Sequence, residues 1–530
     1  KLIDDILPSN DAKKLVTGIV LVALLLLVRT GLIGIRQFLL LRQSKDFNNR
    51  IINAFYSTLL YLPKSFFDTR KIGELIARLN DTGRIQRVIS QVAGSVIIDG
   101  LIAMTSMLFL YYYSWQAGVI ASISLPIYFL LIYRFNDKIM SAQKEVMTGY
   151  AYSESNYIST MQGVSVIKNF NKQEQFAQLN QLIYGNLQEK AFVLGKINIK
   201  LALISGVAGV AFLIGILSYT SYQVYGKTLT LGELMAILGM ASTLLPSVAN
   251  LALVAIPINE AKVAFDRMFE FVNILPEKNQ GINKITFESL QIDSISFRFP
   301  GRKQILKNVS IELKKNEFVA IVGESGSGKS TIGQIVQKFY TPESGTIKVN
   351  NKLNIDEIST IAWRNMIGVV PQDIHLFNGT VLDNICLSNT QEEAEAIIKF
   401  CEEYGFHQFI EQLPQSYITI VGEEGVNLSG GQKQIIALAR ALYSKPQILL
   451  LDEATAAMDR VTERYVLDLL IRLKEQFSVI FISHRLHVLK KMCDKIYVLE
   501  SGKVIAHGDH YKLLTSTNIY SDYWKEIETI

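Results

Sequence analysis

Hydrophobic residues are spread unevenly along this chain of 530 residues. In the N-terminal half they form long runs with few polar interruptions, and a membrane-spanning helix needs about 20 such residues. Five runs approach or exceed that length: 15–41, 96–113, 117–133, 201–225 and 235–256. Several of these runs lack the alternating polar face of a helix on a soluble protein. The pattern therefore predicts five membrane spans.

From about residue 285 the pattern changes. Short β-rich runs alternate with polar helical segments, which is typical of an α/β domain. We therefore expect a transmembrane region with long cytoplasmic loops over residues 1–284 and a separate α/β domain over 285–530, with a hinge at 278–281.

Basic residues predict how the chain crosses the membrane. Lysines and arginines gather in the connections after the first and third runs, and such residues stay on the cytoplasmic side. This places both long connections and the C-terminal domain in the cytoplasm, and the N-terminus outside. Because the chain starts at Lys1 without an initiator methionine or a cleavable signal, we expect at least one further span, with or without another domain, before it.

Composition supports a membrane protein and excludes other classes. Hydrophobic residues make up 49% of the chain and charged residues 19%, below the ~25% charged residues of soluble proteins. The 53 basic and 48 acidic residues are too balanced to indicate a nucleic-acid partner. Cys386, Cys401 and Cys493 have no metal-ligand spacing, which fits a reducing compartment.

A glycine-rich segment after the apolar run 318–322 has the spacing of a P-loop. Its backbone N–H groups can surround phosphate oxygens at the start of a helix. Lys329 can reach the β- and γ-phosphates, and the Ser330 hydroxyl can ligate Mg²⁺. The candidate phosphate-binding residues are Gly323, Glu324, Ser325, Gly326, Ser327, Gly328, Lys329, Ser330 and Thr331.

Two further segments carry candidate chemistry. The apolar run 448–451 ends in Asp452, which suits a magnesium shell, and Glu453, which can act as a general base. A glycine-rich turn at Leu428–Gln432 opens a second helix and predicts a second anion site. A single nucleotide does not require both the P-loop and this second glycine-rich turn from the same chain. We therefore expect this turn to close over a nucleotide that is bound by the P-loop of another subunit.

These motifs together resemble those of ATP-binding cassette (ABC) exporter half-transporters. Residues 419–423 are similar to the exporter X-loop. By the same resemblance the signature is Leu428, Ser429, Gly430, Gly431 and Gln432, the Q-loop glutamine is Gln372, the switch histidine is His484, the D-loop aspartate is Asp459, and the adenine-stacking aromatic residue is Phe299.

The resemblance implies a fold and a mechanism. The fold is an α-helical transmembrane bundle followed by an α/β P-loop NTPase domain. Two such domains would sandwich two ATP–Mg²⁺ units, with Ser330, Gln372 and Asp452 near the metal. Glu453, His484 and Gln372 would be the catalytic groups, and His484 would contact the γ-phosphate. The partner would be a second half-transporter, most simply an identical copy, with a heterodimer as the alternative.

A narrower resemblance concerns the substrate. Residues 66–74 and 2–8 resemble bacterial exporters of bacteriocins and leader-bearing peptides, and 66–74 and 154–168 resemble the two coupling regions of the family. Many of those exporters carry a papain-like peptidase and a first span upstream. This chain has no Cys–His pair for peptide cleavage, so we expect no protease activity. We expect ATP-driven export of a peptide through the bacterial inner (plasma) membrane, with the ATPase domain in the cytoplasm and the helices in contact with lipid.

Several alternatives stay open from the sequence. A lipid or multidrug exporter would have the same architecture, and a nucleotide-gated channel or regulator would carry the same ATPase motifs. A non-transporting ABC ATPase would lack the five spans. Arg29, Arg36 and Asp99 lie in or near the apolar runs, where a charge costs roughly 2.5–3.5 kcal/mol at the bilayer centre. They should not face lipid, and snorkelling and cavity lining are both consistent with Arg29.

Overall fold

The structure is a computed structural model that describes residues 2–6, 11–70, 72–277, 279–388, 390–422, 425–483 and 485–529. The chain divides into two compact units. The first comprises Lys1–Leu62 and Thr69–Leu275, and the second comprises Pro63–Asp68 and Pro276–Ile530. The short segment Pro63–Asp68 therefore belongs to the second unit, although it lies within the N-terminal part of the sequence.

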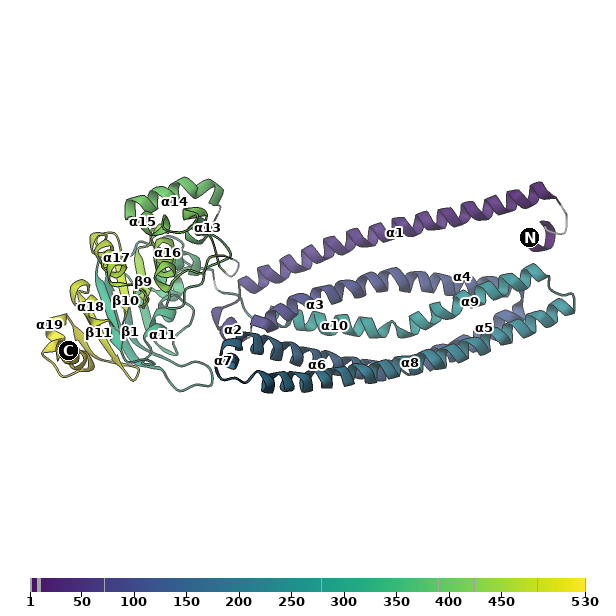
Figure 1. Cartoon of the computed structure of the whole chain (residues 1–530), viewed down its shortest axis with the longest axis horizontal. Coiled ribbons are helices and arrows are strands. Elements are labelled where there is room, and N and C mark those ends of the chain that lie inside the picture. Colours follow the sequence, from purple (N-terminus) through teal and green to yellow (C-terminus); the bar gives the residue numbers. More distant parts are fainter. Residues whose placement is uncertain are drawn as a thin grey trace. The chain divides into compact units, whose positions relative to one another are not determined.

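The first unit is helical, and its long helices run alongside one another (Figure 1). Its elements are η1 (Leu2–Ile6), α1 (Ala12–Leu60), α3 (Ile72–Gln91), η2 (Val92–Val96), α4 (Ile97–Tyr113), α5 (Trp115–Tyr133), α6 (Asn136–Gln162), α7 (Val164–Asn169), α8 (Gln173–Tyr225), α9 (Leu231–Leu253), α10 (Ala255–Met268) and η3 (Glu270–Asn273).

All five apolar runs predicted as spans fall on helices of this unit. Among the described residues, four helical stretches are long and apolar enough to cross a membrane: Ala12–Leu60, Trp115–Gln162, Gln173–Tyr225 and Leu231–Met268. The fifth run coincides with the shorter apolar helix α4. The predicted helical membrane region is therefore confirmed as a set of apolar helices.

The helices are joined by short, well-capped turns at one end. The Ser114 hydroxyl accepts the Ala117 amide between α4 and α5, and Thr230 and Glu233 form a reciprocal capping box at the start of α9. The core lies where α9 packs against α4, α5 and α8, around Leu110 and Ile237. By contrast, the apolar window of α1 buries none of its residues within the chain, as expected of a surface that faces lipid.

The second unit is built on sheets covered by helices. A six-stranded sheet has the order β12-β11-β3-β10-β9-β6 and is parallel except for β12. An antiparallel sheet has the order β2-β1-β4-β5, and β7 and β8 form a small pair. The strands are β1 (Ser289–Phe297), β2 (Leu306–Lys314), β3 (Phe318–Gly323), β4 (Ser344–Val349), β5 (Leu353–Asn354), β6 (Ile367–Val370), β7 (Gly379–Thr380), β8 (Ile420–Val421), β9 (Ile448–Asp452), β10 (Ser478–Ile482), β11 (Lys495–Glu500) and β12 (Lys503–Gly508).

The central strands β3, β9 and β10 are buried along almost their whole length, as expected of parallel strands covered on both faces. The helices are α2 (Lys64–Asp68), α11 (Lys329–Val336), α12 (Thr360–Asn365), α13 (Val381–Cys386), α14 (Thr390–Tyr404), α15 (His407–Ile410), α16 (Gly430–Tyr443), α17 (Arg460–Arg472), α18 (Leu486–Met492), α19 (His510–Leu514) and α20 (Ile519–Thr529), with single turns η4 (Ile355–Glu357) and η5 (Ser416–Ile418).

Candidate functional site

Four neighbouring parallel strands bring the candidate residues to one edge of the sheet. The strands run in the order β3-β10-β9-β6. The P-loop follows β3, Asp452 and Glu453 follow β9, and Gln372 follows β6. Because the carboxyl ends of parallel strands meet at the same edge, residues far apart in the sequence converge there.

The P-loop needs glycine at several positions. The φ values of Gly323, Gly326 and Gly328 are +156°, +79° and +105°. Residues other than glycine rarely adopt such backbone angles. A Cβ at Gly323 would lie 2.0 Å from the Leu499 carbonyl oxygen, and one at Gly328 would lie 2.6 Å from Leu306. The loop is therefore fixed in a tight curve that ends at the start of α11.

Lys329 lies inside this curve. Its side chain is 8% exposed, and its Nζ donates to the carbonyl oxygens of Gly323 (2.9 Å) and Glu324 (2.7 Å). Burial lowers the pKa of this ammonium, while the carboxylates of Glu453 and Asp452 act in the opposite direction. Both carboxylates thus lie close enough to Lys329 to form one electrostatic cluster with it.

The donor groups of the loop fit a phosphate. The Ser327 hydroxyl is buried and has no hydrogen-bond partner among the described residues. A buried hydroxyl without a partner is costly, and a phosphate oxygen in the loop would satisfy it. Together with Lys329 and the start of α11, this hydroxyl makes the loop suitable for a nucleotide phosphate.

Two oxygens beside the loop fit Mg²⁺. The Ser330 hydroxyl donates to Asp452 Oδ1 at 3.3 Å. Burial raises the pKa of Asp452, and the negative charges of Glu453 and Asp373 add to this effect. A bound divalent cation would offset the cost of burying the Asp452 carboxylate and the repulsion from its acidic neighbours. Mg²⁺ prefers hard oxygen ligands and usually takes one or two carboxylates together with substrate phosphates.

Glu453 is held in an unusual backbone conformation. Its φ is +51°, and its amide donates to the Ile482 carbonyl oxygen at 2.8 Å. Gln372 Nε2 donates to Glu453 Oε2 at 3.3 Å. The Glu453 backbone is therefore held by β10 and its side chain by a residue that follows β6, which is an arrangement that can orient a general base.

The signature turn is closed by its own side chains. Ser429 Oγ accepts the Gln432 amide at 3.2 Å, and Gln432 Oε1 accepts the Ser429 amide at 2.9 Å, which forms a capping box at the start of α16. A Cβ at Gly430 would lie 2.7 Å from the Ala457 Cβ. In the described part of the chain, the signature contacts the turn after β9, and no recorded bond joins it to the P-loop.

Gln434, a further residue of this region, belongs to none of the sequence motifs. Gln434 is 4% exposed; its Nε2 donates to the Glu453 carbonyl oxygen at 3.3 Å, and its Oε1 accepts the Ala457 amide at 3.2 Å. It therefore links the signature helix to the turn that carries Glu453. Its position two residues after the signature gives no sequence signal of this contact, because the contact joins segments that only the fold brings together.

The remaining sequence candidates have different surroundings. Asp459 caps α17 by accepting the amides of Val461 (2.8 Å) and Thr462 (2.9 Å), and these bonds hold its pKa below the usual range. Phe299 is half-buried and packs edge-on against Phe297 and Tyr340. His484 lies outside the described residues, so the structure gives it no contacts.

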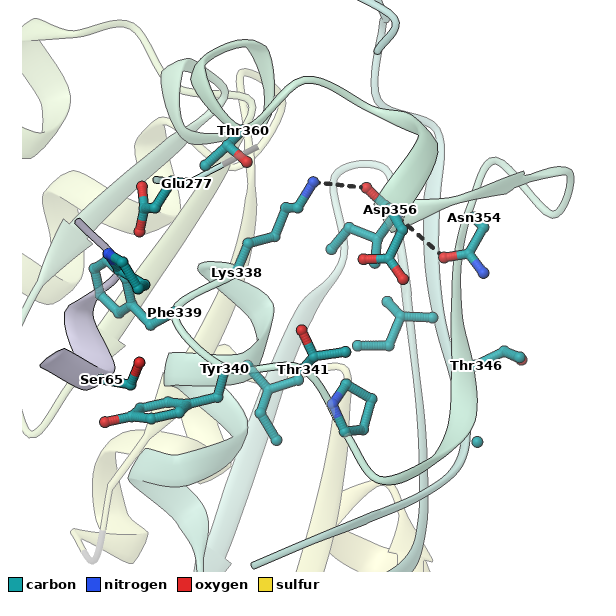
Figure 2. A pocket seen from close by; sticks show the side chains of 16 residues that line it. Ser65, Glu277, Lys338, Phe339, Tyr340, Thr341, Thr346, Asn354, Asp356 and Thr360 are labelled. Carbon is teal, nitrogen blue, oxygen red and sulfur yellow. Dashed lines mark hydrogen bonds between the residues drawn. The ribbon is translucent and has the colours of Figure 1, made fainter. Parts of the chain in front are cut away.

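A separate cavity of about 570 Å³ lies beside the end of α11 (Figure 2). Its lining includes Lys338 and Tyr340, as well as Pro63 and Ser65 of the short segment that contains α2. The Tyr340 hydroxyl donates to Asp68. None of its lining residues belongs to the P-loop. The cavity instead lies, within the second unit, beside the segment that directly precedes the first predicted coupling region, 66–74.

Comparisons with known proteins agree with this geometry. The family model described as "ABC transporter" matches residues 306–456, and the model "ABC transporter transmembrane region" matches residues 1–248. A solved bacterial Atm1-family ABC exporter with ATP bound has the same fold, with a TM-score of 0.89 and 23% identity over 99% of this chain and 94% of that one.

Three curated relatives extend the match over nearly the whole chain. The lactococcin-G-processing and transport protein LagD of Lactococcus lactis subsp. lactis is 31% identical over 98% of this chain and 74% of its own length. The lactococcin-A transport and processing protein LcnC of the same organism is 30% identical (99% and 73%). The alpha-hemolysin translocation protein HlyB of Escherichia coli is 28% identical (94% and 70%). The chain therefore belongs to the ABC transporter family, as an exporter half-transporter that joins a membrane-embedded helical region to an ATP-binding, ATP-hydrolysing domain.

Proposed function

We propose that two copies of this chain pair about a two-fold axis and use ATP hydrolysis to export a polypeptide from the cytoplasm. The observation that carries the ATPase part is the convergence of Lys329, Ser330, Asp452 and Glu453 at one sheet edge. The polypeptide part is supported by relatives named for the transport of lactococcin G and lactococcin A and the translocation of alpha-hemolysin. The domains would span 1–284 and 285–530, in the bacterial inner membrane with lipid around the helices.

Each ATP would be held by residues of both copies. The backbone of Gly323–Thr331 would bind the phosphates, with Lys329 against the β- and γ-phosphates and Phe299 beside the adenine. The signature residues Leu428–Gln432 of the second copy would close over the γ-phosphate, with Asp459 near the contact between the copies. This arrangement gives both anion-binding turns of the chain a ligand, because each nucleotide uses one turn from each copy.

Hydrolysis would follow from the groups around the γ-phosphate. Ser330, Asp452 and Gln372 would hold Mg²⁺, which when bound neutralises charge on the phosphate oxygens. Gln372 already donates to Glu453 and would help to place the attacking water. Glu453 would accept a proton from that water while the water oxygen bonds to the γ-phosphorus. The bond between the γ-phosphorus and the β-phosphate oxygen then breaks, which yields ADP and inorganic phosphate. His484 would contact the γ-phosphate.

Transport into inside-out vesicles tests this proposal. We expect vesicles containing the full-length protein to accumulate a leader-bearing peptide when ATP is added, and Glu453→Gln vesicles to accumulate none. Accumulation of a hydrophobic dye or a lipid analogue in place of the peptide would favour the lipid or multidrug exporter. Accumulation of no compound by active protein would contradict pumping and favour a gated channel.

A second prediction concerns Gln434. Replacing it with leucine keeps the volume but removes its hydrogen bonds to the Glu453 carbonyl oxygen and from the Ala457 amide, so that the Glu453 carbonyl retains the bond from the Ala456 amide. We expect kcat for ATP hydrolysis to fall about 10-fold, or ~1.4 kcal/mol, while KM for ATP stays unchanged, because the base is misplaced after ATP has bound. Steady-state kinetics measure this split. Gln412→Leu, at an exposed glutamine, is the matched control, and equal losses in both variants would contradict the role.

A further inference from the structure

The buried face of α4 carries a carboxylate within the apolar part of the first unit. Asp99 is 8% exposed and lies near the start of α4. It stands about four helical turns before Tyr113, which is ~21 Å along the axis. Because a hydrocarbon core is about 30 Å thick and the charge pattern places Tyr113 at the outer side, Asp99 lies inside the core and nearer the cytoplasm.

The chain supplies this carboxylate with a neutral partner. Asn250 Nδ2 on α9 donates to Asp99 Oδ2 at 3.1 Å. Within the described part of the chain, Asp99 forms no ion pair, and its second oxygen has no recorded partner. Of the two arginines in the apolar part of α1, Arg36 donates to the Gly94 carbonyl oxygen at 2.6 Å, and Arg29 is exposed, with no ion pair to Asp99 among the described residues. A carboxylate at this depth is normally paired with a charge or a polar group, so a cation from outside the described chain would complete this site.

The Asp99–Asn250 pair opens onto a face of α9 that is unsuited to lipid. Asn250 is exposed, and so are four small or polar residues on the same side of α9: Gly239, Ser242, Thr243 and Pro246. Residues 19–28 of α1, in contrast, are all exposed, and all except Ala23 are leucine, isoleucine or valine. Since polar groups in a membrane face a protein interior or a water-filled path, this face of α9 borders a polar space.

We propose that the Asp99 carboxylate, held in place by Asn250, binds a positively charged ammonium or guanidinium group of the transported polypeptide. The inference rests on the proposed function, because it assigns the polypeptide a basic side chain at a defined depth. Asn250 occupies one carboxylate oxygen and fixes its direction, and the other oxygen is available to the cation. The site thereby selects for positive charge in the substrate.

Asp99→Asn distinguishes a binding site for a positive charge from a hydrogen bond that only joins α4 to α9. Asp99→Asn keeps an oxygen that can accept the Asn250 amide, so the hydrogen bond and the packing remain while the charge is lost. Asp137→Asn, at an exposed aspartate at the start of α6, is the matched control. Thermal unfolding of each purified variant checks that its fold is intact.

The measurement is equilibrium binding to the full chain in lipid nanodiscs without nucleotide. The probes are a fluorescent apolar peptide with one lysine and the same peptide with norleucine in its place. We expect the wild type and Asp137→Asn to bind the lysine peptide about 10-fold more tightly, as one charge-assisted hydrogen bond allows. We expect Asp99→Asn to bind both peptides equally.

Two results would overturn the site: a wild type without preference for lysine, or a preference that survives in Asp99→Asn. The pump is judged separately by ATP-dependent uptake of the same peptides into vesicles. Selective binding without uptake would retain the site and reject peptide export. Uptake without selective binding would retain the pump and reject the site.

Discussion

Glu453→Gln should lower the rate of ATP hydrolysis by roughly 10²–10⁴-fold, the contribution of a positioned general base, and leave ATP binding intact. The substitution keeps the shape of the side chain but removes its ability to take a proton from water. Gln372 can still hydrogen-bond to the new amide oxygen, and the backbone contact with Ile482 is unaffected. Phosphate release and equilibrium binding of a fluorescent ATP analogue measure the two quantities.

A matched exposed residue controls for the loss of one negative charge. Glu475→Gln, on the surface of the same unit, should hydrolyse ATP at the wild-type rate. If Glu453→Gln retained more than about a tenth of the wild-type rate, another group would have to accept the proton, since a general base contributes at least 10²-fold. Loss of ATP binding in Glu453→Gln would instead indicate a defect in folding.

Structural features that depend on short-range sequence patterns could be predicted from the sequence. The apolar runs are long enough to identify five helices, and the P-loop spacing places Lys329 at the start of a helix after a strand. Such features are local, because backbone conformation and burial are decided within a few residues. Asp452 at the end of a buried apolar strand was recognisable for the same reason.

Contacts between distant segments could not be predicted in this way. The bridge from Gln434 to Glu453 joins residues on different elements, and the amide of Asn250 meets Asp99 across 151 positions. Within the second unit, the segment Pro63–Asp68 makes contacts with residues far along the chain, such as the hydrogen bond between Asp68 and Tyr340 and the packing of Lys64 over the Phe339 ring. Sequence periodicity shows which face of a helix is buried but not which partner covers it.

Two inactive variants, Lys329→Met and Ser429→Asp, test whether each ATPase site is built from two chains. Lys329→Met removes the ammonium from the P-loop and keeps its apolar stem. Ser429→Asp keeps a good N-cap for α16 but puts a carboxylate where the γ-phosphate would bind. Each variant alone should lose nearly all ATP hydrolysis, because both sites of its dimer contain the defect.

A mixed dimer would contain one undamaged site. If the P-loop of one copy works with the signature of the other, the Lys329→Met copy still supplies an intact signature to the intact P-loop of its partner. If both turns acted within one chain, each chain of the mixed dimer would carry a defect. The two arrangements therefore predict opposite results for the same complex.

The most direct measurement is the rate of ATP hydrolysis by mixed dimers, isolated through a different affinity tag on each variant. A two-fold symmetric sandwich predicts about half of the wild-type rate, since one of two equivalent sites is intact. Mixed dimers that are as inactive as either variant alone would contradict a catalytic site shared between two chains.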